Sequence, residues 1–182
     1  MNMQYDFTLK FKLPPNEVDQ NEVVERLGES GCDDALVGIG LPGMIGLDFT
    51  REAESAKEAI LSAITDVTRA IPGARLVEVG PDFVGLSDVA SVLGVSRQAV
   101  RKTMLSHRDT FPAPLHQGNT SIWHLAPVLH WLRERGMWRL DVQILEVADT
   151  AMQVNLAKDT AELVPTMRRQ VRAILKRQNN HC

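Results

Sequence analysis

The chain has 182 residues, of which 44% are hydrophobic and 24% are charged. This ordinary globular composition excludes a disordered or fibrous protein. No apolar run approaches the roughly 20 residues that span a bilayer, and the first residues lack the apolar stretch of a signal peptide. The two cysteines, Cys32 and Cys182, are too few for a disulfide scaffold. We therefore expect a cytoplasmic protein without a membrane segment, a metal or another cofactor.

The net charge of −3 is distributed unevenly along the chain. Residues 1–84 carry seven basic and fifteen acidic side chains, a net charge of −8, whereas residues 85–136 have a net charge of +3 and residues 137–182 of +2. An acidic first part followed by basic parts indicates different partners for each.

The first 80 residues have the pattern of an α+β domain. In residues 4–12 the side chains of Tyr5, Phe7, Leu9 and Phe11 fall on one face, as in a strand with one buried side. The order of elements predicts a ferredoxin-like βαββαβ sandwich, which we place at residues 1–82. The other expected elements are helices over 20–29 and 54–71, a hairpin of 35–40 with 44–50, and a strand over 75–80.

The most informative segment is LSDVASVLGVSRQAVRKTML, residues 86–105. Ala90, Gly94 four residues later and Val100 six residues further have the spacing of a helix-turn-helix. The small side chain of Ala90 allows two helices to cross closely, and Gly94 allows the sharp turn between them. The expected helices are 87–93, capped by Ser87, and 96–105, capped by Ser96.

The second of these helices has an apolar side and a polar side. Val100 and Met104 share one side at about 100° per residue. Arginine pairs two donors with guanine and glutamine pairs with adenine, so the other side has the chemistry that recognises bases in the major groove. Ser96 and its neighbouring N–H groups could hold a phosphate. The alternatives are that the polar side of the helix is only a solvated face and that Ser96 is only a helix cap. The expected DNA contacts are Ser96, Arg97, Gln98, Arg101 and Lys102.

Residues 107–125 are expected to form a β-hairpin wing beside this helix. Phe111-Pro112 is an apolar anchor, Gly118-Asn119 suits a two-residue hairpin turn, and Ile122-Trp123 belongs to the returning strand. The tip would then lie near the DNA backbone, whereas the alternative is a surface loop with no partner. The expected wing contacts are His116, Gln117 and Asn119.

These features together resemble the winged helix-turn-helix DNA-binding domains of the MerR/excisionase superfamily, over about 50 of the 182 residues. The resemblance implies a DNA-binding domain at 85–136 in which the helix after the wing closes the core. MerR-type regulators generally place this domain first, whereas here an acidic domain precedes it. Neither cysteine is placed like a metal-sensing ligand, so metal sensing does not carry over. The layout is also similar to that of a group of bacterial DNA-binding proteins. The implied core residues are Trp123, Val128, Leu129 and Leu132.

Two longer helical patterns, over 139–156 and 159–177, each carry an apolar stripe that needs a partner surface. They could pack on each other, on the DNA-binding domain or across a two-fold axis. Because helix-turn-helix repressors bind paired half-sites as dimers, we expect residues 137–182 to help build a homodimer; a helical hairpin in a monomer is the alternative. The basic side chains of the last helix could contact phosphates or form a solvated face. They are Arg168, Arg169, Arg172, Lys176 and Arg177.

No residue pattern indicates catalysis. The five histidines lack the spacing of a helical zinc pair, and the glycines of 38–46 lack the Lys-Ser/Thr of a phosphate-binding loop. We therefore expect a sequence-specific DNA-binding transcriptional regulator, a repressor, and not an enzyme. The alternative is a protein-interaction adaptor or antitoxin-like protein that uses the acidic domain. That domain could also bind a small molecule or mask the basic domain.

Overall fold

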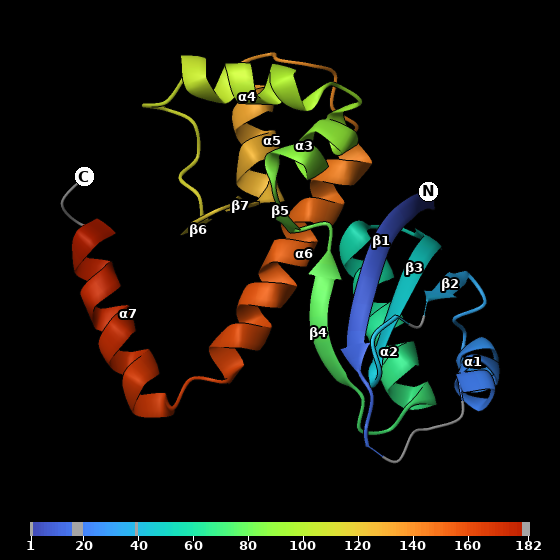
Figure 1. Cartoon of the computed structure of the whole chain (residues 1–182). Coiled ribbons are helices and arrows are strands. Elements are labelled where there is room, and N and C mark those ends of the chain that lie inside the picture. The colour runs from blue at the N-terminus through green and yellow to red at the C-terminus, as the bar shows by residue number, and fades with distance from the viewer. Residues whose placement is uncertain (1, 16–19, 39, 180–182) are drawn as a thin grey trace.

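The computed structural model describes residues 2–15, 20–38 and 40–179 (Figure 1). The fold is mixed α+β, with an antiparallel four-stranded sheet and a three-stranded sheet. Residue 39, inside the predicted hairpin, and Cys182 lie outside the described residues. Among the described helices none is both long and apolar enough to cross a membrane.

The first half contains all six predicted elements in the predicted order. The strands pair in the order β2-β3-β1-β4, and β1 is antiparallel to both β3 and β4, with Phe7 opposite Phe49. The alternating face of β1, including Tyr5 and Leu9, is buried in a core to which both helices contribute. The elements are β1 (Met3–Lys12), α1 (Gln20–Glu29), β2 (Ala35–Gly38), β3 (Met44–Ala53), α2 (Ala56–Ala70) and β4 (Arg75–Gly80).

The second half contains a small sheet and three helices. Its strand order is β5-β7-β6, and the short strand β5, which the sequence analysis does not predict, pairs with β7 through Val84 and Trp123. A second core forms around Trp123, Leu125 and Leu129. The elements are β5 (Phe83–Val84), α3 (Leu86–Leu93), α4 (Arg97–Ser106), β6 (His116–Gln117), β7 (Ser121–His124) and α5 (Leu125–Glu134).

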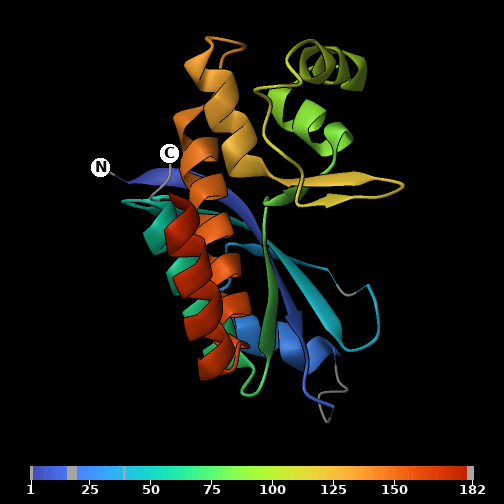
Figure 2. The same cartoon turned by 90° about the vertical axis from the view of Figure 1, so that its left-hand side faces the viewer.

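Helix α6 (Val142–Ala161) runs along both halves, as Figure 2 shows. It contributes Val147 and Ala151 to the first core and Leu145 and Ala148 to the second. The stripe predicted over 139–156 is therefore covered within the chain, by both halves. Helix α7 (Pro165–Asn179) turns back from the end of α6 and projects away from the rest of the molecule (Figure 1).

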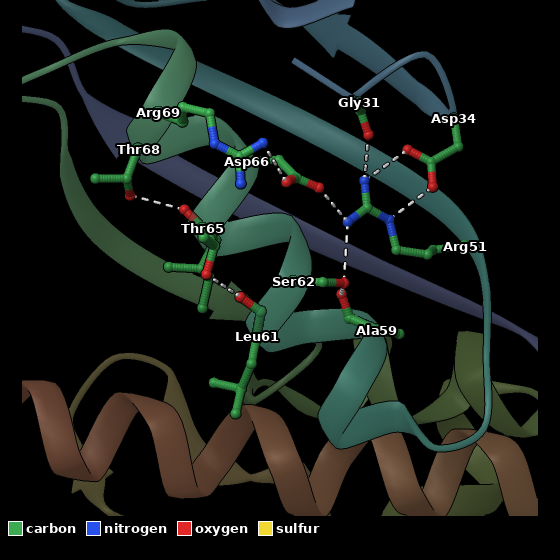
Figure 3. A network of polar contacts seen from close by, with 11 residues as sticks. Gly31, Asp34, Arg51, Ala59, Leu61, Ser62, Thr65, Asp66, Thr68 and Arg69 are labelled. Carbon is green, nitrogen blue, oxygen red and sulfur yellow. Dashed lines mark hydrogen bonds and ion pairs between the residues drawn. The ribbon is translucent and has the colours of Figure 1, made fainter.

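A buried arginine ties the first half together (Figure 3). Arg51, only 7% exposed on the core side of β3, donates to both carboxylate oxygens of Asp34 at 2.7 and 3.0 Å and to Asp66 at 2.8 Å. It also donates to the Ser62 hydroxyl and the Gly31 carbonyl. Each of the five N–H groups of the guanidinium thus has an acceptor, which offsets the cost of its burial.

A second buried network joins the two halves to α6. The Asp82 carboxylate, 1% exposed, accepts hydrogen bonds from His124 Nδ1 at 2.7 Å and from Asn155 Nδ2 at 2.8 Å. Its backbone carbonyl accepts from the Leu125 N–H at 2.7 Å. The segment Pro81-Asp82, where the sequence predicts a boundary between domains, is therefore fixed by contacts to three elements.

Candidate nucleic-acid interface

The turn between α3 and α4 is built as the residue spacing predicts. Gly94 ends α3 with a φ of 65°, a conformation that favours glycine. The Val95 N–H donates to the Ala90 carbonyl at 3.0 Å, which closes the end of α3. Val89, Ala90 and Val100 are buried where the two helices meet, so α4 is held against α3 by its apolar side.

The start of α3 differs from the prediction. The helix begins at Leu86, with Gly85 as its N-cap, so Ser87 lies inside the first turn and does not cap it. The Asp88 carboxylate, in the first turn, accepts the Gly85 N–H at 2.7 Å, so it binds the N-cap residue itself and does not take over the bond expected of the serine. A carboxylate suits the positive end of a helix.

Helix α4 presents its cationic side to solvent. Ser96 is its N-cap, as predicted, and its hydroxyl accepts the Ala99 N–H at 3.2 Å. Val100 is 1% exposed, whereas Thr103 and Met104 are half-buried. The predicted contact residues of this helix all lie on the exposed side: Ser96, Arg97, Gln98, Arg101 and Lys102.

A short hairpin lies where the sequence predicts the wing, but its turn is longer than predicted. β6 pairs antiparallel with β7, His116 opposite Ile122 and Gln117 opposite Ser121. Three residues, 118–120, therefore connect the strands instead of the two expected at Gly118-Asn119, because Thr120 remains outside the ladder. His116, Gln117 and Asn119 are all exposed.

Tryptophan fixes the wing to the second core. Trp123 is 5% exposed, and its indole N–H donates to the Pro112 carbonyl at 2.9 Å. The Phe111 ring meets the edges of both Trp123 and Trp131. The three other residues that the resemblance places in the core are also buried: Val128, Leu129 and Leu132.

A groove of about 950 Å³ lies between α4, the start of α3 and the wing. It brings together Arg97 from the helix with Gln117 and Asn119 from the hairpin, although these residues are distant in sequence. Ser96, Gln98, Arg101 and Lys102 do not line it, and together they border a separate shallow surface on α4. Seven of the eight predicted contacts thus form two surfaces, whereas His116 lines neither of them.

Arg108 also lines this groove, and the sequence analysis does not include it among the contacts. It lies two residues after the end of α4 and seven residues after Arg101, which is the spacing of two helical turns. The periodic pattern continued past the predicted end of the helix would have identified it. Asp88 and Asp109 line the same groove, so its walls carry both signs of charge.

No family model matches this chain, and the comparison with curated proteins found no match. Within the described residues no cluster of three or more His, Cys, Asp or Glu side chains could hold a metal ion.

Proposed function

We propose that this chain is a sequence-specific DNA-binding transcriptional regulator, a repressor, in which α4 enters the major groove. The observation that carries the proposal is the exposure of Arg97, Gln98, Arg101 and Lys102 on a helix whose opposite side is anchored by Val100. Such a helix can enter a groove without unfolding, and its side chains have the donors that pair with guanine and adenine.

Residues 85–136 act as a winged helix-turn-helix in this proposal. The order α3-α4-wing-α5 and the sheet order β5-β7-β6 support that assignment. Arg97 and the wing residues Gln117 and Asn119 border one groove, so a DNA backbone that passes the wing is within reach of both. His116, on the same hairpin, adds a further donor on the exposed side.

Residues 1–82 act as a ferredoxin-like domain in this proposal. The strand order β2-β3-β1-β4 with two helices on one face supports that assignment. Its net charge of −8 over residues 1–84 repels DNA, so this domain binds a protein or a small molecule that controls the regulator. Residues 137–182 serve as the helical extension that supports dimerisation.

A selection of bound genomic fragments followed by a gel shift tests the proposal. Arg101→Ala is expected to weaken the best site by about 1–3 kcal/mol while leaving non-specific binding nearly unchanged. Arg75→Ala removes the same charge from an exposed site on β4 and is expected to bind like the wild type.

Three outcomes would count against it. Failure to enrich any fragment excludes sequence-specific binding. Equal losses in both variants assign the effect to net charge alone. A stable complex with another protein, formed without DNA through the acidic domain, favours the adaptor function instead.

A further inference from the structure

The apolar side of α7 is left uncovered by the described part of the chain. Every described side chain from Pro165 to Lys176 is exposed, and Val164 and Ile174 have exposed fractions of 61% and 60%. Single apolar residues on a surface are ordinary, but a contiguous apolar patch marks an interaction site. The exposed apolar residues are Leu163, Val164, Met167, Val171, Ile174 and Leu175.

The spacing of these residues indicates a helix as the partner. Val164, Met167, Val171 and Ile174 follow one another at intervals of three, four and three residues, which places them in a line that another helix can cover. Arg168 and Arg172 border this line, and no acidic residue occurs in α7. The matching surface is therefore an apolar helix side bordered by carboxylates.

The outward side of α6 has an exposed large apolar side chain with carboxylates beside it. Leu156 is 44% exposed and lies on the far side of the helix from Val147 and Ala151, which enter the first core. Asp149 and Asp159 lie within about 60° of Leu156 around the helix axis. Their carboxylates contact the His130 ring and the Lys158 ammonium respectively, and both side chains stay partly exposed, at 43% and 61%.

The two surfaces cannot meet within one chain in the observed arrangement. Only residues 162–164 separate α6 from α7, and the Arg168 guanidinium donates to the Thr160 carbonyl across the bend. The two helices consequently diverge (Figure 1). Direct pairing of α7 with a second α7 would bring Arg168 and Arg172 of both copies together, which is unfavourable.

We propose that α7 of one chain packs on the outward side of α6 of a second copy, and that the same contact is repeated in the opposite sense. A two-fold axis buries the contact twice, which brings a modest helix surface nearer to the area of a stable dimer. This dimer supplies the second copy that binding to paired half-sites requires under the proposed function. Its formation is tested without DNA.

The solution mass is the first test. The wild type is expected to form a species of two 20.2 kDa chains, measured by light scattering during size exclusion over a range of concentrations. The double variant V171E/I174E is expected to raise the dimer dissociation constant at least about tenfold. Leu36, at 74% exposed, lies in β2 at the sheet edge opposite β4, so L36E is the control and is expected to dimerise normally.

A charge exchange then tests the position of the contact. R168E/R172E and D149R/D159R should each weaken dimerisation, because each places like charges together. Mixing the two variants should restore a two-chain species, since both α7–α6 contacts of the mixed dimer then join opposite charges. Circular dichroism of each variant confirms that it remains folded.

Several results would overturn the inference. They are a wild type that keeps the mass of one chain at every concentration, a V171E/I174E variant that still dimerises, an L36E variant that loses the dimer equally, and a mixture of folded charge variants that does not recover it. Because no DNA is present, these results leave the test of DNA binding unaffected, and failure to bind DNA leaves the mass unaffected.

Discussion

Asn155 of α6 hydrogen-bonds to both backbone groups of Val79 in β4. The Asn155 Nδ2 donates to the Val79 carbonyl at 2.8 Å, and the Val79 N–H donates to Asn155 Oδ1 at 2.9 Å. One amide thus occupies the place that another strand would take beside this edge strand. The same Nδ2 donates to the buried Asp82 carboxylate, so a single side chain joins the sheet, the connection to β5 and α6.

Asn155→Ala is expected to destabilise the protein by roughly 2–4 kcal/mol, because it leaves two buried backbone groups and one carboxylate oxygen without these partners. Urea denaturation followed by circular dichroism measures the change. Gln153→Ala, an exposed amide on the same helix, is the control and should change stability by no more than about 0.5 kcal/mol. Equal effects of both variants would show that the Asn155 hydrogen bonds contribute nothing.

The Arg51 network gives a second expectation. Arg51→Leu leaves Asp34 and Asp66 without their cation and should cost roughly 2–4 kcal/mol, somewhat less than a fully buried pair because both carboxylates keep some exposure. Arg51→Lys should recover only part of this loss, since an ammonium cannot form the fork to Asp34.

Arg69→Leu is the matched control for this network. Its side chain is 63% exposed and pairs with Asp66 at 3.4 Å, so its removal should be nearly neutral. A chemical denaturation series of the three variants decides the point. A fully stable Arg51→Leu variant would contradict the assigned role.

Two glycines should respond oppositely to the same substitution. Gly94 has a φ of 65° and Gly28 lies within α1, and in each case nothing stands within 4 Å of an added Cβ. Gly94→Ala is expected to cost about 1 kcal/mol, because L-residues are strained in the left-handed region. Gly28→Ala should stabilise by about 0.4–1 kcal/mol through the unfolded chain. Thermal denaturation distinguishes the signs, and a shared sign would refute the backbone argument.

Cys32 predicts a loss of stability at high pH. The thiol is buried, and this burial raises its pKa from 9.0 to about 11 although Arg51 opposes the shift. Between these pH values the unfolded chain releases the thiol proton and the folded chain keeps it. The contribution of this thiol to the free energy of unfolding is therefore fully present below about pH 9 and is lost as the pH rises through 11.

The measurement is the unfolding free energy of the wild type and of Cys32→Ala at several pH values from 8 to 11. The difference between the two curves removes the titration of other groups. This difference in unfolding free energy should become smaller as the pH rises, because the wild type loses stability. Parallel curves would exclude a shifted thiol.

Patterns that depend on neighbouring residues could be predicted from the sequence. The alternation of Tyr5, Phe7, Leu9 and Phe11 identified β1 and its buried face, and the exposed side of α4 follows from helical periodicity alone. The cap at Ser96 is likewise a local matter. Whether the wing and α4 contact DNA stays a prediction, because exposure is a property of the chain and binding also depends on the partner.

Features that depend on distant residues were missed. β5 has two residues and exists only because β7 lies beside it. Arg51 continues the buried alternation of Leu47 and Phe49, but no local rule places its carboxylate partners on two other segments. Asn155 interrupts the apolar side of α6, and that polar interruption was the signal for a buried hydrogen-bonding role.

Because α6 supplies side chains to both hydrophobic cores, neither half of the molecule keeps a complete interior without it. A fragment that ends at residue 136 therefore lacks part of both hydrophobic cores. Removal of the first 84 residues exposes the side of α6 that packs into the first core. We accordingly expect the intact protein to melt in one cooperative transition, in which the four-stranded sheet and α4 lose their structure together.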